Sequence, residues 1–176
     1  MKIKSLFPKF NLNVKFMELN DSAGQFWHKS DIVVLDSGLK KKLPGCAKIV
    51  FLHEMIHATG SDKRLIRLRR LIEIFGKYSE GSLSFRMEEC IAEIGCMVVA
   101  MKLGLLNDYS RAVIIPGLEK NYTPDMYIPI REIRAAVKYF ADDETSFEEE
   151  IEAVKNYLDA FLDIKFQDSY TKKDAA

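Results

Sequence analysis

The 176-residue sequence has few of the residues on which many specialised proteins depend. It contains 3 histidines and 3 cysteines, and its net charge is zero because 26 Lys and Arg residues balance 26 Asp and Glu residues. A neutral chain argues against non-specific binding to nucleic acids or membranes, which usually needs an excess of basic residues. The hydrophobic fraction of 48% and the charged fraction of 30% are ordinary for a globular protein, which excludes the disordered and fibrous classes.

The cysteines and the N-terminus bear on the cellular compartment. Cys46, Cys90 and Cys96 are odd in number and too widely spaced for a disulfide framework, so we expect buried, reduced thiols. No apolar run approaches the roughly 20 residues that cross a bilayer. The basic start of the chain is interrupted at Pro8 and Lys9 before an apolar segment develops, which disfavours a secretory signal peptide. We therefore expect a cytoplasmic protein with no membrane partner.

The hydrophobic pattern changes from extended to helical along the chain. Residues 12–36 alternate and end in the β-branched run Ile32–Leu35, which a turn at Asp36–Gly38 closes. From Pro44 onward the spacing is helical. A small antiparallel or mixed sheet followed by helices predicts a single α+β domain over residues 1–176. The expected helices cover residues 44–59, a segment that follows a cap at Ser61 or Asp62, and residues 83–105, 128–141 and 146–165.

Two details of this pattern predict which residues are buried. Gly60 is placed to end the helix at 44–59. Trp27 and the methionines are interpreted as core residues. The apolar residues of the next helix recur at helical spacing and predict its buried face: Leu65, Leu68, Ile72 and Phe75.

The sequence His53-Glu54-Met55-Ile56-His57 places two of the three histidines four residues apart on a predicted helix. Residues i and i+4 lie on one helix face about one turn apart, so both imidazoles can bind one metal ion. Glu54 is rotated by roughly 100° from His53, where it can accept a proton from metal-activated water without being a ligand. The alternative is a pair of half-buried histidines held by hydrogen bonds alone.

The third metal ligand is expected on another helix. A catalytic zinc ion normally takes three protein ligands, and no other histidine lies nearby in the sequence. Carboxylates in the apolar helix at 83–105 need strong partners, and Glu89 shares its face with small residues that allow a close approach, so we assign Glu89 as the third ligand. Glu93, one turn on, could accept the free ring N–H of a ligand histidine. Glu88, about 100° away, is the alternative ligand, and a solvated acidic face is the alternative to the whole arrangement.

Other residues could complete a hydrolytic site. The run Ile32–Leu35 could present an open strand edge to an extended peptide. Three residues are candidates to stabilise an oxyanion, and the sequence does not decide between them: His28, Tyr122 and Tyr127.

Basic residues flank the predicted metal helix, and acidic residues concentrate near the C-terminus. Binding of nucleic acid through the basic set is an alternative that we do not favour. Solvated helix faces, or pairing between the two sets, explain the pattern more simply. The basic set comprises Lys40, Lys41, Lys42, Lys48, Lys63, Arg64, Arg67, Arg69 and Arg70.

The chain from residue 31 to about residue 140 resembles the zincin-like metallopeptidase domain of plasmid and phage anti-restriction proteins of the ArdC type. The resemblance covers more than half of the chain and includes positions outside the HExxH motif. The matching segments are Asp31–Leu35, Leu52–Gly60, Arg64–Leu65, Glu88–Gly95 and Leu103–Leu105.

The resemblance implies a gluzincin-type fold in which both motif histidines and a glutamate of the Glu88/Glu89 pair bind one Zn²⁺ ion. Arg64 matches the family pattern and could hold a carboxylate near the site. Family members with anti-restriction activity usually carry a separate N-terminal domain that binds single-stranded DNA, whereas only about thirty residues precede the matched region here. The resemblance also indicates a phage or mobile-element protein, whose location would be the host cytoplasm.

These observations predict a zinc-dependent metallopeptidase that cleaves a peptide or protein substrate with metal-activated water, Glu54 taking the proton. The alternative is a non-catalytic zincin-fold binding or inhibitor protein, an anti-restriction or host-defence antagonist, in which zinc supports the fold. A third interpretation is a metal-free helical protein that binds nucleic acid. No sequence feature indicates an oligomeric state.

Overall fold

The computed structural model describes residues 10–43, 45–105, 116–118, 120–122 and 129–140. The chain divides into two compact units, Met1–Asp142 and Asp143–Ala176, and all the described residues belong to the first. The helix predicted at 146–165 and the acidic C-terminal set lie outside the described residues, and a single domain over residues 1–176 stays a prediction. Within the described part, none of the helices is long and apolar enough to span a membrane.

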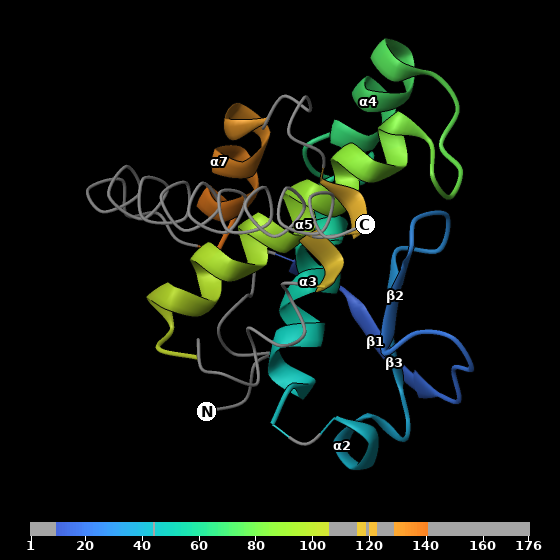
Figure 1. Ribbon diagram of the computed structural model, residues 1–176, viewed down its shortest axis with the longest axis vertical. Helices are drawn as coiled ribbons and strands as arrows, with labels where there is room; N and C mark the ends of the chain where they lie inside the picture. The colour runs from blue at the N-terminus through green and yellow to red at the C-terminus, as the bar shows by residue number, and fades with distance from the viewer. Residues whose placement is uncertain (1–9, 44, 106–115, 119, 123–128, 141–176) are drawn as a thin grey trace, which may run out of the picture. The chain divides into compact units, whose positions relative to one another are not determined.

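The first described segments form a three-stranded mixed sheet that leads into the helices (Figure 1). Strand β1 (Asn13–Met17) pairs in parallel with β3 (Ile32–Asp36), and β2 (Gly24–Trp27) pairs antiparallel with β3. The strand order is therefore β1-β3-β2. This sheet, with the helices that follow it, confirms the α+β class.

Strand β3 is the central strand of the sheet, and its burial explains its composition. Val33 and Val34 point to opposite faces and both are fully buried. A continuous β-branched run is typical of a strand that is covered on both faces. The expectation that Ile32–Leu35 presents an open edge is therefore wrong, because β1 and β2 occupy both of its edges. Among the described strands, β2 pairs on one side only.

The HExxH motif lies on helix α3 (Ala47–Thr59), which follows the short helix α2 (Leu39–Lys42). The predicted helix at 44–59 is confirmed with a start three residues later. Helix α3 packs against β2 and β3 and also against α5 (Leu83–Lys102) and α7 (Ile130–Lys138). Figure 1 shows α3 between the sheet and α7. Because it is covered on several sides, α3 is apolar around most of its circumference.

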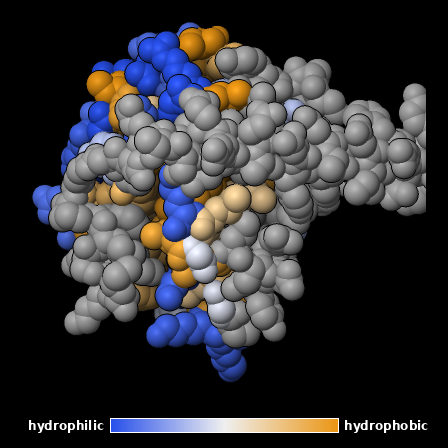
Figure 2. All heavy atoms as spheres, turned by 90° about the vertical axis from the view of Figure 1, so that its left-hand side faces the viewer, coloured by the Kyte–Doolittle hydropathy of each residue, from blue (hydrophilic) through white to orange (hydrophobic). Residues whose placement is uncertain are grey.

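Helix α4 (Arg67–Phe75) buries a different face from the predicted one. Arg67 and Leu71 are buried, whereas Ile72 and Phe75 are 38% and 37% exposed. The inward face is set by the contact of α4 with α5, which brings Arg67 into the core. Figure 2 shows hydrophobic side chains among hydrophilic ones at the upper end of the molecule, where Figure 1 places α4.

Helix α4 also begins later than predicted. The residues after Ser61 form turns, and Ile66 has a left-handed φ of 55° just before the helix starts at Arg67. A β-branched residue rarely adopts this conformation. The chain changes direction at Ile66, and the following residue enters the core.

Helices α5 and α7 confirm the helices predicted at 83–105 and 128–141, with ends shorter by a few residues. The hydroxyl of Ser82 caps α5 by accepting a hydrogen bond from the Phe85 N–H at 3.3 Å. The small-residue face of α5 lies against α3, where the Cys96 thiol donates to the Ile49 carbonyl at 3.5 Å. All three cysteines are buried and free, as predicted.

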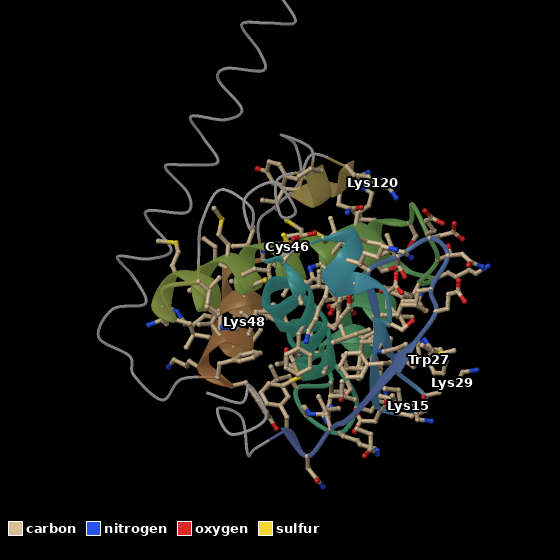
Figure 3. The ribbon with its side chains drawn as sticks, turned by 90° about the horizontal axis from the view of Figure 1, so that it is seen from below. Lys15, Trp27, Lys29, Cys46, Lys48 and Lys120 are labelled. Atoms are coloured by element: carbon tan, nitrogen blue, oxygen red, sulfur yellow. The ribbon has the colours of Figure 1, made fainter. Side chains whose placement is uncertain are left out.

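The outer face of the sheet carries a side chain that we expected in the core. Trp27 is 39% exposed, and its Nε1–H donates to the Gln25 Oε1 atom at 3.0 Å. Met17 on β1 is similarly exposed. Figure 3 shows Trp27 with Lys15 and Lys29 on the side of the sheet away from α3. The core interpretation is therefore wrong for Trp27 and Met17.

Candidate metal centre

Three side chains predicted as ligands come together between α3 and α5. The Nε2 atoms of His53 and His57 lie 3.0 Å apart. The Glu89 carboxylate lies 3.7 Å from the Nε2 atom of His53 and 3.4 Å from that of His57. One ligand atom from each residue lies within 4.8 Å of the others.

This donor set fits a small divalent cation. Atoms bound about 2.0–2.1 Å from a tetrahedral zinc ion stand about 3.3–3.4 Å from one another, and the observed separations bracket that value. Two imidazoles and one carboxylate leave a fourth position for water or substrate, as in catalytic zinc sites.

The second ring nitrogen of His53 faces Glu93. The Nδ1 atom lies 3.4 Å from the Glu93 Oε2 atom, as expected for a carboxylate that orients a ligand histidine. The backbone at Gly117 lies against this carboxylate, since a Cβ atom at residue 117 would stand 1.9 Å from Glu93 Oε1. Glu93 is therefore confined between His53 and the 116–118 segment.

The second ring nitrogen of His57 faces Glu88. The Nδ1 atom lies 3.2 Å from Glu88 Oε1, on the opposite side of the ring from Glu89. The two consecutive glutamates thus contact different nitrogens of one imidazole. The structure groups Glu89, and not the alternative ligand Glu88, with the two histidines.

Arg67 is the part of the site that the sequence reasoning missed. It is 0% exposed, and its guanidinium donates to both carboxylate oxygens of Glu88, from Nε at 2.8 Å and from Nη2 at 2.5 Å. Burial works to raise the pKa of Glu88, but the charge and hydrogen bonds of Arg67, with those of His57, lower it to about 2. The sequence feature that indicates such a partner is Glu88 itself, because a carboxylate inside an apolar helix needs a cation beside it.

Arg64 holds a carboxylate at the end of α3. Its guanidinium binds both carboxylate oxygens of Asp31 at 2.7 and 3.0 Å, and it donates to the Ala58 carbonyl at 3.0 Å. Arg64 thereby joins the turn between β2 and β3 to the end of α3. The carboxylate that it holds is Asp31, whereas Arg67 holds Glu88.

Several residues of the basic set form ion pairs within the chain. Their partners do not belong to the acidic C-terminal set, which lies outside the described residues, so pairing between the two sets stays a prediction. Arg67, which we expected on a solvated face, is buried. The pairs from residue 63 onward are Lys63 and Arg64 with Asp31, Arg67 with Glu88, Arg69 with Asp62, and Arg70 with Glu132.

Glu54 lies beside the three candidate ligands, at a cavity of about 160 Å³. Burial raises the pKa of Glu54, against the opposing charges of His53 and His57. A raised pKa suits a group that accepts and later returns a proton. Strand β2 approaches closely here, since a Cβ atom at Gly24 would stand 2.9 Å from Glu54 Cγ. The cavity is lined by Ala23, Gly24, Ile49, Val50, His53, Glu54 and Glu93.

The carboxylates around the histidines create a strongly negative potential. Burial works to lower the pKa of His53, but the charges of Glu93, Glu54 and Glu89 raise it to about 10. The same balance, led by Glu89, raises the pKa of His57. A site with this potential favours a bound cation.

The candidates for oxyanion stabilisation have different placements. The His28 ring packs against Phe26 and Tyr78, with centroids 4.8 and 6.1 Å away, and its buried Nδ1 atom has no hydrogen-bond partner among the described residues. Burial, with the charge of His57, lowers the pKa of His28 to about 4. Tyr122 is half-buried, and Tyr127 lies outside the described residues.

Tyr78 is a further candidate that the sequence did not single out. Burial raises the pKa of Tyr78, and the charges of Glu88, Glu89 and Glu54 add to the shift. Its ring packs against Phe85, one turn before Glu89 on α5. Because Tyr78 lies in a loop without a periodic pattern, no sequence signal marked it.

The fold and the site together define an α+β protein with a candidate metal centre of two histidines and a glutamate. No protein-family model matches the sequence, and no curated protein matches it. Among solved structures, the chain is similar to the crystal structure of the antirestriction ArdC protein from the R388 plasmid in its Mn(II)-bound form, with 19% sequence identity and a TM-score of 0.48. The match covers 84% of this chain and 51% of the ArdC chain, so the chain spans about half the length of that protein.

Proposed function

We propose that the protein is a zinc-dependent hydrolase that cleaves a peptide bond in a peptide or protein substrate. The observation that carries the proposal is the convergence of His53, His57 and Glu89 within 4.8 Å, with the buried carboxylate of Glu54 beside them. In this assignment His53, His57 and Glu89 hold one Zn²⁺ ion, and Glu54 is the catalytic base. The ion, when bound, would lower the pKa of a water molecule and polarise the carbonyl of the scissile bond.

The protein's own groups would move the proton and orient the ligands. Glu54 accepts a proton from the attacking water and returns it to the leaving amine, for which its raised pKa is suited. Glu93 and Glu88 each face the ring nitrogen of a ligand histidine that points away from the ion, and so fix both imidazoles.

The edge of β2 would position the substrate. Gly24 lies against Glu54, and β2 pairs only with β3 among the described strands. An extended peptide added to this edge would receive main-chain hydrogen bonds and pass beside Glu54. The small cavity next to Gly24, which apolar residues of α3 line together with His53, Glu54 and Glu93, would accept a small side chain of that peptide.

The metal itself is tested directly. Two imidazoles and one carboxylate suit zinc, and carboxylates also suit manganese, the metal in the ArdC crystal structure. We expect purified protein to contain about one equivalent of zinc and His57→Ala protein to contain almost none. A native protein that holds no metal, and binds neither Zn²⁺ nor Mn²⁺ on addition, would contradict the proposal.

Catalysis is tested with Glu54→Gln, which removes the base and leaves the three ligands. We expect this variant to keep its metal and to lose at least about 100-fold in the rate of peptide cleavage, the usual scale of a general-base contribution. The substrate is a mixture of random-sequence peptides, with cleavage followed by mass spectrometry. An unchanged rate in metal-loaded Glu54→Gln protein would refute the mechanism.

A second candidate function is a binding protein, an antirestriction protein or host-defence antagonist, in which the metal supports the fold. The observation that favours it is the burial of His57, Glu88 and Arg67, which join α3, α4 and α5 in one network. In this case His53→Ala unfolds the protein, whereas Glu54→Gln leaves its biological effect intact. Loss of that effect in Glu54→Gln protein would favour the hydrolase instead.

A further inference from the structure

Arg67 is a fully buried cation whose hydrogen bonds reach both helices of the candidate metal centre without touching a proposed ligand. We propose that Arg67 is a positioning residue of this centre, which fixes the Glu88 carboxylate and, through it, the ring of His57. The inference rests on the proposed metal site and adds to it a residue that the family pattern and the ligand set do not assign.

The geometry between Arg67 and His57 runs through both oxygens of Glu88. The Nε and Nη2 atoms of Arg67 donate to Oε2 and Oε1 at 2.8 and 2.5 Å. Such a two-point contact fixes the plane of a carboxylate as well as its position. Oε1 lies 3.2 Å from His57 Nδ1, so the imidazole is held with Nε2 toward Glu89.

The remaining hydrogen bonds of Arg67 hold the helix that carries the histidines. Its Nη1 atom donates to Thr59 Oγ1 at 2.8 Å, and Nη2 also donates to the Ile56 carbonyl at 3.0 Å. Both acceptors lie in the last turn of α3, where a cation is also favoured by the helix dipole. Arg67 therefore sets the distance between the end of α3 and the start of α5.

Gly60 supplies the space that this contact needs. A Cβ atom at residue 60 would stand 2.8 Å from Arg67 Nη2 and 3.1 Å from Glu88 Oε1. The φ of Gly60 is −77°, which any residue can adopt, so the backbone conformation does not require glycine. The glycine that we expected only as a helix end is explained by the close approach of Arg67 and Glu88.

Arg64 provides a matched control within three residues. It is also a nearly buried arginine that binds a carboxylate and a carbonyl at the end of α3, in this case Asp31 and Ala58. The carboxylate that Arg64 binds, that of Asp31, lies at the turn between β2 and β3 and does not belong to the proposed ligand set. If the removal of any buried arginine weakens metal binding, both variants lose affinity. If the effect is specific to the metal centre, only the Arg67 variant loses affinity.

The experiment measures Co²⁺ binding to the full chain, with Co²⁺ as a visible probe of the zinc site. The variants are Arg67→Met, Glu88→Gln, the double Arg67→Met/Glu88→Gln, and Arg64→Met, each checked for folding by circular dichroism and urea unfolding. We expect Arg67→Met to weaken Co²⁺ binding by about 10-fold or more and to change the visible absorption spectrum of the complex. Arg64→Met should lower stability but keep the affinity within about twofold of wild type and leave the spectrum unchanged.

The double variant tests whether Arg67 acts through Glu88. It removes both buried charges, so it remains informative if Arg67→Met alone does not fold. We expect Arg67→Met to change the affinity by less than about twofold in the Glu88→Gln background, because the residue it orients is already altered. The inference is overturned if Arg67→Met still lowers the Co²⁺ affinity 10-fold in the Glu88→Gln background, or if Arg64→Met lowers the affinity as much as Arg67→Met does. A folded Arg67→Met protein with wild-type affinity and spectrum also overturns it. Wild-type protein that binds no Co²⁺ would instead overturn the proposed metal site.

Discussion

Gly117 and Glu93 are in such close contact that any side chain at residue 117 would displace the Glu93 carboxylate: a Cβ atom there would stand 1.9 Å from Oε1. The other carboxylate oxygen lies 3.4 Å from His53 Nδ1. The backbone of the 116–118 segment thus helps to orient a proposed metal ligand, although no residue of that segment belongs to the ligand set.

We therefore expect Gly117→Ala to weaken metal binding by about 10-fold, because the shifted Glu93 no longer orients His53. The measurement is a competition titration with a chromophoric zinc chelator. Gly38→Ala is the control, because a Cβ atom at Gly38 would meet only the flexible end of Lys42 and the Asp36 carboxylate at 3.3 Å or more. Equal zinc affinities for wild type and Gly117→Ala would contradict the expectation.

Gly24→Ala should separate metal binding from hydrolysis. A Cβ atom at residue 24 would stand 2.9 Å from Glu54 Cγ and 2.9 Å from Val50 Cγ1, so Glu54 must move. We expect kcat/KM for peptide cleavage to fall by about 10-fold or more, since a displaced base transfers protons poorly. The zinc affinity should stay within about twofold of wild type. A parallel loss of both properties would show that Gly24 supports the whole site and not Glu54 in particular.

The pair of Asp31 and Arg64 predicts a loss of stability in acid. Burial works to raise the pKa of Asp31, but the hydrogen bonds and charge of Arg64, with those of Lys63, lower it below its ordinary value. A lowered folded-state pKa gives stability that is fully present above the unfolded pKa of about 3.9 and is lost as the pH falls through the folded value.

Asp31→Asn should accordingly reduce the free energy of unfolding by roughly 1.5–3 kcal/mol at pH 7, the scale of hydrogen bonds to charged groups. Asparagine also tolerates the left-handed φ of 56° at this position. Urea unfolding at pH 7, 4 and 2.5 measures the effect. The difference between wild type and Asp31→Asn should shrink at the lowest pH, and a constant difference at all three values would refute the electrostatic explanation.

The reactivity of the buried cysteines can measure how much a bound metal stabilises the folded protein. All three are buried and free, and burial, with the charge of Glu93, raises the pKa of Cys90 to about 12. Native protein should therefore react slowly with a thiol reagent, and denatured protein should react at all three thiols. Zinc at 100 times its dissociation constant should slow the reaction by about 100-fold if labelling requires global unfolding. A rate that zinc does not change would show that labelling occurs through local opening away from α3 and α5.

The helices could be predicted from the sequence because their signals are local. The spacing of His53 and His57 places both on one side of a helix, and the small residues near Glu89 indicate the face that approaches it. The structure brings these three residues together, and their binding of zinc stays a prediction. The first long helix ends at Thr59, as predicted, but Gly60 has an ordinary φ of −77° and its lack of a side chain is explained by the packing of Arg67 and Glu88.

The parts that could not be predicted depend on contacts between distant residues. The parallel pairing of β1 with β3 makes Ile32–Leu35 a central strand, and β2 has only four residues, the first of them glycine. Arg67 lies 21 residues from Glu88, and its charge suggested a solvated face. Once Glu88 is recognised as a buried carboxylate, a cation from another element becomes necessary, but the sequence does not say which one.

The clamp that Arg64 forms between Asp31 and the Ala58 carbonyl joins two elements that lie beside Glu54. The turn of the β2–β3 hairpin and the end of α3 are tied together, so the strand edge that would receive a peptide keeps a fixed relation to Glu54. The remaining ligand, Glu89, comes from α5 and is not part of that clamp. In the proposed metal site, a bound ion would add a second link between α3 and α5 to the one that Arg67 makes through Glu88, and the alignment of Glu54 with the edge of β2 would not depend on that ion.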